Sequence, residues 1–283
     1  MLTIAIQKSG RLNENSLELL NECGIKFKHS RNSLKQTAKN FPLELLNLRN
    51  SDIPFYVSNG VADIGIIGEN SLLEHNHPLT TIKKLGFGKC KLSLAVPKEV
   101  DYNSIKFFDG KKIATSYPNS LNKFLIENNI VAKIHEISGS VEIAPSIGLA
   151  DGVCDLVESG STLFMNGLKE VEVLFNSQAV LIANNNLTSE KQGILNKLLF
   201  RIEATLNAKN NKYVVLNLPN ENLEKISKLL PGINSPTIIP LKKIGWSALH
   251  SVISEIDFWN SIEQLKALGA EGILVMPIEK MIS

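Results

Sequence analysis

Two stretches of the chain repeat one pattern, in which an apolar run ends at a glycine turn and a helix begins. Residues 61–74 align without gaps with residues 153–166, so that Gly68 corresponds to Gly160. Short apolar runs that stop at glycine predict strands, and the apolar spacing that follows predicts helices. Because the two stretches lie 92 residues apart, they belong to different parts of the fold. The repeat therefore predicts two similar α/β lobes.

The beginnings of the two lobes also correspond. TIAIQKSGRL, from residue 3, and KIATSYPNSL, from residue 112, each predict a strand followed by the start of a helix. Strands that alternate with helices favour mostly parallel sheets, and ligands bind at the carboxyl ends of such strands. We therefore expect four loops to line one cleft between the lobes. These loops are residues 7–12, 68–71, 115–119 and 159–162.

The chain is expected to cross between the lobes twice, near residues 92–97 and again within residues 171–183, which read as a pair of extended strands. The first lobe then comprises residues 1–94 and 178–211, and the second comprises residues 95–177. A helix at residues 189–207 has apolar residues at helical spacing and is expected to pack back on the first lobe.

The last 72 residues, 212–283, predict a separate domain with the order β-α-β-β-α-β, which is the ferredoxin-like pattern. Asn220 is expected to cap the first helix of this domain, and Asp257 the second. The fold class is therefore α/β, with two lobes and a ferredoxin-like C-terminal domain of the type that often binds regulatory ligands.

Residues 159–162 form the most informative segment for function. A glycine turn after an apolar strand offers clustered backbone N–H groups and hydroxyls, which bind phosphate. The carboxylates of Asp151 and Asp155 precede this turn and suit ribose hydroxyls or a metal ion. The spacing D-x-x-x-D-x-x-x-x-G-x-T is similar to that of enzymes that use 5-phosphoribosyl 1-pyrophosphate (PRPP). An ordinary turn without a ligand is the alternative reading of the same residues.

Charge and composition exclude several classes of function. A net charge of +2 without runs of like charge argues against nucleic acid as a partner. The chain contains no apolar stretch of about 18 residues, so we expect no membrane span. Only residues 2–6 are apolar before Lys8, which disfavours a secretion signal and favours a cytoplasmic location. The three cysteines lie far apart and form no zinc or disulfide pattern.

Arginine is rare in this chain, with four among the 30 basic residues. Arg11 and Arg49 stand beside glycine or polar turn residues, where a guanidinium group can grip phosphate with two hydrogen bonds. A solvated surface charge is the alternative for either residue.

Several segments along the chain resemble the long form of the ATP phosphoribosyltransferase family. The segments are IAIQKSGRL, DIPFYVSNGVADIGIIGEN, KIATSYPNSL, SGSVEIAP, CDLVESGSTL with NGLKEVEVLF, and LKALGAEGILVMPIEKM. The resemblance implies a glycosyltransferase (pentosyltransferase) that joins N1 of the ATP adenine to PRPP, with Mg²⁺, as the first step of L-histidine biosynthesis. It also implies lobes like those of periplasmic binding proteins, feedback inhibition by L-histidine in the C-terminal domain, and homo-oligomers in which dimers form hexamers.

The resemblance further assigns roles to individual residues. The residues for PRPP are Glu142, Asp151, Asp155, Ser159, Gly160, Ser161 and Thr162. The residues for ATP or pyrophosphate are Lys8, Gly10, Arg11, Arg49, Glu69 and Tyr117. The residues for histidine are Ser235, Thr237 and Ala270. Lys8, Arg11 and Asp155 are expected to act electrostatically, no acid or base is assigned, and the metal ligands stay unassigned.

Other interpretations remain open at this stage. Asp63 and Asp155 occupy matching positions in the repeat, so both can be structural. Glu142 can favour a helix start after Ser140. Residues 49–52 depart from the acidic string that is usual in the family. A two-lobed small-molecule binding protein without catalysis explains the cleft but not the pairing of a phosphate turn with a regulatory domain. A transcription regulator with such lobes needs a DNA-reading domain before the first strand, and this strand is expected to start at residue 2.

Overall fold

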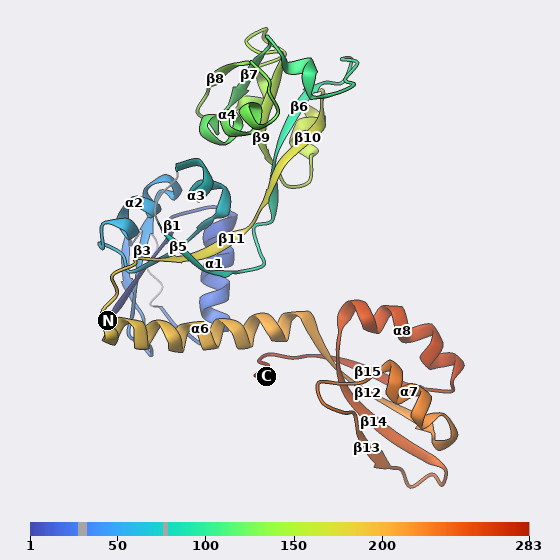
Figure 1. Cartoon of the computed structure of the whole chain (residues 1–283). Helices are drawn as coiled ribbons and strands as arrows, with labels where there is room; N and C mark the ends of the chain where they lie inside the picture. Colours follow the sequence, from blue (N-terminus) through green and yellow to red (C-terminus); the bar gives the residue numbers. More distant parts are fainter. Residues whose placement is uncertain (28–32, 76–78, 283) are drawn as a thin grey trace. The chain divides into compact units, whose positions relative to one another are not determined.

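The structure, a computed structural model, describes residues 1–27, 33–75 and 79–282, and the strands within this part of the chain form three sheets (Figure 1). The first sheet has the strand order β2-β3-β1-β4-β11-β5 and, with its helices, forms the first lobe. Its strands are β1 (Leu2–Gln7), β2 (Lys35–Thr37), β3 (Leu43–Leu48), β4 (Ile64–Gly68), β5 (Thr80–Lys84) and β11 (Ala179–Ala183). The helices of this lobe are α1 (Arg11–Glu22), η1 (Asn50–Asp52), α2 (Ile53–Ser58) and α3 (Glu69–His75).

The second sheet has the order β10-β6-β9-β7-β8 and forms the second lobe. Its strands are β6 (Cys90–Pro97), β7 (Lys112–Thr115), β8 (Lys133–Glu136), β9 (Gly152–Val157) and β10 (Leu168–Ser177). Its helices are η2 (Ile105–Phe108), α4 (Pro118–Glu127), η3 (Val141–Ile143) and α5 (Ser161–Met165). The two copies of the repeat are the β4–α3 and β9–α5 units, which confirms the prediction of two similar α/β lobes.

The sheets are mixed, and the expectation of mostly parallel sheets was wrong. β1 runs parallel to β3 and β4, and β7 runs parallel to β8 and β9. The strands that carry the chain between the lobes pair antiparallel, since β11 lies beside β4, and β6 lies beside β9 and β10. A strand that enters a sheet by crossing from another lobe is not constrained by the right-handed connection that makes β-α-β units parallel.

The crossings lie slightly away from their predicted positions. β6 begins at Cys90 and belongs to the second sheet along its whole length, so residues 90–94 are not part of the first lobe, where the boundary at residue 94 placed them. An apolar run shows that a strand exists but not which sheet it joins. The return crossing consists of two consecutive strands, as expected: β10 in the second sheet and β11 in the first are separated only by Gln178.

A buried carboxylate fixes the start of the long helix α6 (Ser189–Asn210) on the first lobe. Asp63 is 4% exposed, accepts a hydrogen bond from the Thr3 backbone N–H at 2.8 Å and forms an ion pair with Lys191 at 2.7 Å. Asp63 is therefore structural. The start of this helix therefore contacts the first lobe, as expected, whereas residues 195–210 belong to the other compact unit of the chain.

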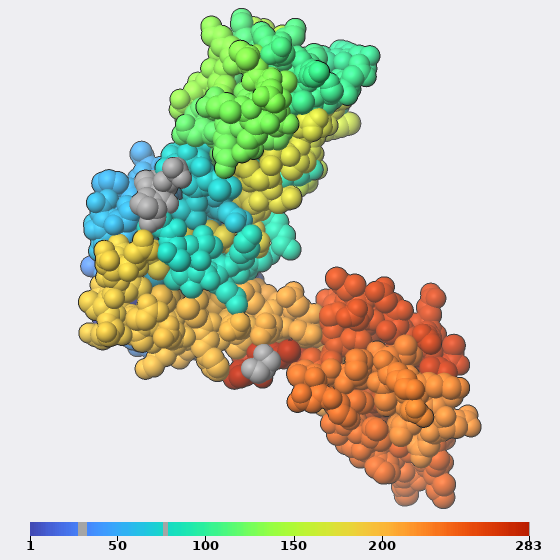
Figure 2. Space-filling view, viewed as in Figure 1, coloured from blue at the N-terminus to red at the C-terminus, as the bar shows by residue number. Residues whose placement is uncertain are grey.

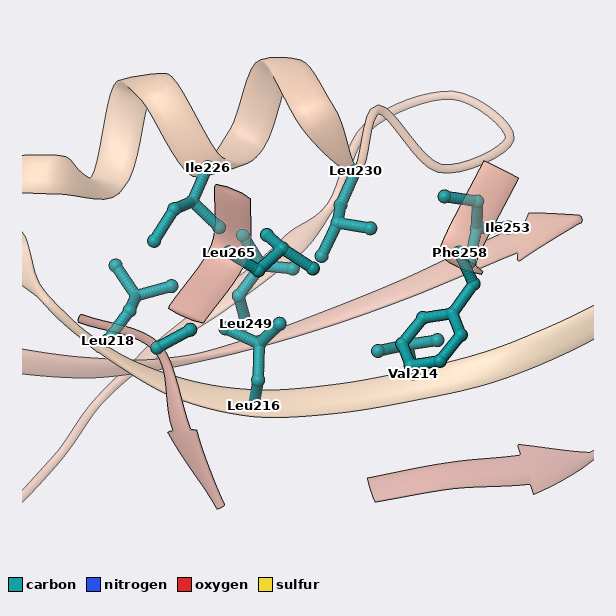
Figure 3. Packing of buried hydrophobic residues seen from close by; sticks show 10 residues of the cluster. Val214, Leu216, Leu218, Ile226, Leu230, Leu249, Ile253, Phe258 and Leu265 are labelled. Atoms are coloured by element: carbon teal, nitrogen blue, oxygen red, sulfur yellow. The ribbon is translucent and has the colours of Figure 1, made fainter. Parts of the chain in front are cut away.

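The C-terminal domain has the ferredoxin-like order that its sequence predicts. Its sheet is antiparallel with the order β13-β14-β12-β15. Its elements are β12 (Asn211–Pro219), η4 (Asn220–Asn222), α7 (Leu223–Leu229), β13 (Thr237–Pro240), β14 (Trp246–Ser254), α8 (Glu255–Ala267) and β15 (Glu271–Pro277). Figure 3 shows the core between the two helices and the sheet, where Leu216 and Leu249 of the strands meet Ile226 of α7 and Leu265 of α8.

The predicted helix caps of this domain were wrong by a few residues. Asn220 lies in η4, and its side-chain oxygen accepts a hydrogen bond from the Ser247 hydroxyl at 2.8 Å instead of capping α7. Ser254, and not Asp257, is the N-cap of α8, because its Oγ accepts from the Asp257 N–H at 3.1 Å. The Ser254 hydroxyl also donates to the Asp257 carboxylate at 2.6 Å.

The chain divides into two compact units. The first comprises residues 1–18 and 25–194, and the second comprises residues 19–24 and 195–283. Most of α6 therefore belongs to the second unit, where Arg201 donates a hydrogen bond to the Cys23 carbonyl at 3.2 Å. Lys197 and Phe200 of this helix are exposed, and the helix is the gold stretch of surface in Figure 2. Among the described residues, no helix is both long and apolar enough to cross a membrane.

We predict that Asp63→Ala lowers the free energy of unfolding by roughly 1–3 kcal/mol, because it leaves the Thr3 N–H without its acceptor and Lys191 without its partner. Urea unfolding followed by circular dichroism measures this change. The control is Asp101→Ala, at an exposed position of the second lobe. Equal stability of the two variants would contradict an anchoring role for Asp63.

Candidate functional site

The candidate residues of the first lobe lie at one edge of its sheet. β3, β1 and β4 are adjacent and parallel, so their carboxyl ends lie at the same edge. Arg49 follows β3, and Glu69 follows β4. Lys8 and Gly10 lie in the loop after β1, and Arg11 begins α1. The parallel pairing therefore places all the predicted nucleotide-binding residues of this lobe at one sheet edge.

The second lobe repeats this arrangement. β8, β7 and β9 are adjacent and parallel. Tyr117 follows β7, Glu142 lies in η3 after β8, and residues 159–162 follow β9. We call residues 159–162 the phosphate turn. The four loops expected at the carboxyl ends of strands all lie there.

The phosphate turn has the geometry that its sequence predicts. Gly160 adopts a positive φ of 77°, a conformation that residues other than glycine rarely adopt. Helix α5 starts at the next residue. The hydroxyls of Ser159 and Ser161 lie 3.0 Å apart, and Ser159, Ser161 and Thr162 are all exposed. The turn therefore presents three hydroxyl groups to solvent, together with backbone N–H groups of the first helical turn.

The loop after β1 also depends on glycine, since Gly10 has a φ of 88°. Lys8 of this loop and Arg11 at the start of α1 are exposed. Arg11 forms an ion pair with Glu158, the residue immediately before the phosphate turn. This contact brings together the two loops to which the sequence assigned phosphate binding, although an ion pair between exposed groups contributes little stability.

Asp155 lies in a partly apolar environment. The alternation of β9 places it on the same face as Val153 and Val157, which belong to an apolar cluster with Val141 and Leu163. Burial raises the pKa of the Asp155 carboxyl above its usual range, and the negative charge of Glu142 adds to this effect, while a hydrogen bond from the Leu156 N–H opposes it. Asp155 and Asp63 therefore match in the repeat but not in their surroundings.

Tyr117 connects the loops of the two lobes. Its hydroxyl accepts a hydrogen bond from the side-chain amide of Asn70 at 3.3 Å. Burial raises the pKa of Tyr117 to about 12, and the charge of Asp155 contributes to this rise. Tyr117 therefore keeps its proton at neutral pH and remains a hydrogen-bond donor beside Asp155.

A small polar cavity of about 170 Å³ lies beside Tyr117, between α3 and the loop after β7. Its lining includes Asn50, Asn70, Ser116 and Glu74. Ligand sites usually enclose roughly 300–1,000 Å³, so this cavity accommodates part of a ligand such as a purine base but not a whole nucleotide.

The structure does not bring every predicted residue together. Asp151 lies before β9, at the opposite end of this strand from the phosphate turn, and its carboxylate accepts a hydrogen bond from the Lys112 N–H at 2.8 Å. A sequence motif shows how close two residues are along the chain, but the ends of a six-residue strand such as β9 lie about 20 Å apart in space. Glu69 begins α3 and forms an ion pair with Lys84 at 3.3 Å.

The predicted histidine-binding residues also lie apart within one chain. Thr237 is on β13, with Ser235 just before it, whereas Ala270 immediately precedes β15. β13 and β15 are the two edges of the C-terminal sheet, separated by β14 and β12. Three strand spacings of about 4.8 Å keep these residues from forming one pocket in a single copy.

Three residues near the site were missed by sequence reasoning. Asn70 and Glu74 lie on α3, are 5% and 4% exposed, and contact the second lobe. Their positions four residues apart on a helix after Gly68 were a usable signal, because such residues share a face. The signal for Glu158 was its position directly before the expected phosphate site. A carboxylate at that position would repel phosphate unless a cation such as Arg11 paired with it.

Comparisons with known proteins agree with this geometry. Residues 49–204 match the family model described as ATP phosphoribosyltransferase, and residues 208–280 match the one described as HisG, C-terminal domain. An ATP phosphoribosyltransferase from Cytophaga hutchinsonii is 56% identical, covering 100% of this chain and 99% of its own. One from Phocaeicola vulgatus is 55% identical, covering 100% of both. The solved ATP phosphoribosyl transferase (HisG:HisZ) complex from Thermotoga maritima contains a chain with 29% identity and a TM-score of 0.64, which covers 73% of this chain and 98% of that one.

We predict that Asp155→Asn raises the free energy of unfolding at pH 7. Because the folded state raises the pKa of Asp155, the folded protein loses stability as pH rises from the ordinary value of about 3.9 through the raised value. The uncharged amide removes this loss, so the gain should be present at neutral pH and vanish below about pH 4. Urea unfolding at several pH values measures it, with Asp101→Asn as the exposed control. A gain that does not depend on pH would contradict the electrostatic cause.

Proposed function

The chain belongs to the ATP phosphoribosyltransferase family, and we propose that it joins N1 of the ATP adenine to C1 of PRPP, giving N1-(5-phospho-β-D-ribosyl)-ATP and pyrophosphate. This reaction is the first step of L-histidine biosynthesis. The observation that carries the proposal is the phosphate turn at the carboxyl end of β9, in a chain whose relatives of that name match it over its whole length.

PRPP is assigned to the second lobe. The hydroxyls of Ser159, Ser161 and Thr162 suit the three terminal oxygens of the 5′-phosphate, and Gly160 allows the backbone to approach them. Asp155 and Glu142, whose charges interact, are the carboxylates that we assign to the ribose. Asp151 is not part of this proposed site, because its side chain is engaged at the other end of β9.

The reaction distributes charge in a way that fits these residues. When the bond from C1 to pyrophosphate breaks, positive charge develops on the ribose and negative charge on the leaving group. Asp155 and Glu142 would stabilise the first, and Lys8 and Arg11 the second. The adenine nitrogen is itself the nucleophile, so the enzyme needs to align two substrates rather than to form a covalent intermediate.

ATP is assigned to the first lobe and the cavity beside Tyr117. The exposed residues Lys8, Gly10 and Arg11 suit its phosphates. The cavity, which is polar and small, suits the base. Arg49 directly precedes Asn50 of the cavity lining, and Glu69 directly precedes Asn70, so both belong to loops that approach the nucleotide.

Mg²⁺ is proposed as the cofactor, bound together with substrate phosphates. Among the described residues, no group of three or more His, Cys, Asp or Glu side chains is placed to hold a metal ion. A site with only one or two protein carboxylates suits Mg²⁺, because this ion usually keeps several waters and binds phosphate oxygens as well. Asp155 and Glu142 are the available carboxylates, and the ion would neutralise part of the charge on the pyrophosphate.

L-Histidine is proposed as the inhibitor, and homo-oligomers of dimers and hexamers as the assembly. Because Thr237 and Ala270 lie at opposite edges of the C-terminal sheet, a histidine site that uses both requires a second copy of the chain. The location in the cytoplasm also remains a proposal.

An assay for product formation distinguishes the enzyme from the alternative, a two-lobed binding protein without catalysis. Purified protein is mixed with ATP, PRPP and Mg²⁺, and pyrophosphate and phosphoribosyl-ATP are measured. We expect both products in equal amounts. Binding of PRPP without either product would favour the binding protein.

We predict that Thr162→Val weakens PRPP binding by roughly 1–3 kcal/mol, or about 5- to 140-fold, because it removes one hydroxyl donor to a charged phosphate while keeping the shape of the side chain. Isothermal titration with PRPP measures the change. Thr37→Val, at an exposed position of β2, is the matched control. An unchanged dissociation constant would exclude Thr162 from the phosphate contact.

We predict that variants at the two edges of the C-terminal sheet complement each other. Thr237→Arg and Ala270→Val should each lose inhibition by histidine, whereas co-expression of the two should restore inhibition at a fraction of the sites, where the intact edges of two copies meet. Activity assays with increasing histidine measure this. Mixed oligomers that remain insensitive would place the effector site within one copy.

A further inference from the structure

A buried carboxylate of the first lobe bonds to the second lobe. Glu74, on α3, is 4% exposed. Its two carboxylate oxygens accept hydrogen bonds from the backbone N–H groups of Asn119, at 2.8 Å, and Ser120, at 2.9 Å. The Glu74 main-chain carbonyl accepts a third hydrogen bond, from the side-chain amide of Asn119 at 3.1 Å.

These bonds satisfy the first turn of α4 from outside its own lobe. The first N–H groups of a helix have no partner within the helix, and a side chain from the preceding residue usually accepts from them. Here the acceptor comes from a helix 45 residues earlier in the chain. A carboxylate at a helix N-terminus also interacts favourably with the helix dipole, so the contact is charge-assisted.

The contact lies beside the proposed site. Glu74 lines the small polar cavity, and Tyr117, which precedes α4, receives the hydrogen bond of Asn70 from the preceding turn of α3. The crossing between the lobes contains Gly86 and Gly88, both with positive φ, which permits backbone conformations that other residues rarely adopt. The two crossings are also held to each other, because the Ala179 N–H donates a hydrogen bond to the Phe87 carbonyl at 2.9 Å. The Glu74 bonds are therefore a second connection between the lobes, away from the crossings.

We propose that Glu74 is a positioning residue, whose bonds to α4 set the two lobes so that the nucleotide and PRPP half-sites face each other. This inference rests on the proposed reaction. Because Glu74 also lines the cavity assigned to the adenine base, the dissociation constant of ATP is measured together with that of PRPP. Because each substrate is assigned mainly to one lobe, loss of the Glu74 contact should affect the joining of the substrates more than the binding of PRPP.

Glu74→Gln tests this inference. Glutamine keeps the size of the side chain but has one acceptor oxygen in place of two and no charge. We expect kcat to fall about 10- to 100-fold, since misplacement of reacting groups by about 1 Å costs rate on that order. The dissociation constant of PRPP should change less than about twofold. Glu127→Gln, at the exposed opposite end of α4, should change neither value.

A second variant separates positioning from simple stabilisation of α4. Asn119→Asp places a carboxylate in the first turn of α4, which favours the helix itself but repels Glu74. Positioning by Glu74 predicts that Asn119→Asp lowers kcat about tenfold or more, and that the double variant with Glu74→Gln loses no more than Glu74→Gln alone, because both changes act on one contact. A purely structural role predicts unchanged kcat and an unchanged or higher melting temperature.

The outcomes distinguish this inference from the proposed function. No turnover by the unaltered protein would overturn the reaction itself. Normal turnover with kcat of Glu74→Gln within about threefold of it would overturn only the role of Glu74. An equal fall in kcat and PRPP affinity would also overturn it, because the damage would then lie within the second lobe. Circular dichroism of every variant confirms that the compared proteins are folded.

Discussion

Parallel pairing of the central strands in each lobe is the constraint on which the site depends. β3, β1 and β4 end at one edge of the first sheet, and β8, β7 and β9 end at one edge of the second. Loops far apart in sequence are thereby gathered without any loop having to be long. The first lobe contributes cations to its edge, and the second contributes hydroxyls and carboxylates. This separation suits a reaction in which opposite charges develop on a sugar and on its leaving group.

The site keeps polar groups in surroundings that are unfavourable for them. Asp155 shares a face with valine residues, and burial raises its pKa and that of Tyr117. The ionised Asp155 carboxylate therefore reduces stability at neutral pH, whereas Tyr117 keeps its proton there and its raised pKa has no such effect. Asp63, the counterpart of Asp155 in the repeat, is instead neutralised by Lys191 and serves the fold. The two matching carboxylates of the repeat therefore differ in their partners, since Asp155 accepts a hydrogen bond from the Leu156 N–H and has no ion pair among the described residues.

Local patterns in the sequence predicted the elements well, and long-range pairings less well. Glycine turns, apolar spacing and the phosphate turn are local, so the repeat, the ferredoxin-like domain and residues 159–162 were correctly located. The sheet to which β6 belongs, the distance of Asp151 from the turn and the bond of Asn220 to Ser247 depend on three-dimensional contacts. Glu74 illustrates the same limit, since its acceptor role exists only once α3 and α4 meet. The role of each candidate residue toward a substrate stays a prediction.

A crystal structure of the protein with PRPP and Mg²⁺ would show whether the glycine turn after β9 holds the 5′-phosphate of PRPP. We expect phosphate oxygens at about 2.7–3.2 Å from the Thr162 hydroxyl and from backbone N–H groups of residues 160–162. We also expect C1 of the ribose to lie beside Asp155 or Glu142. Density for the 5′-phosphate at another place, with the turn facing only solvent, would contradict this proposal.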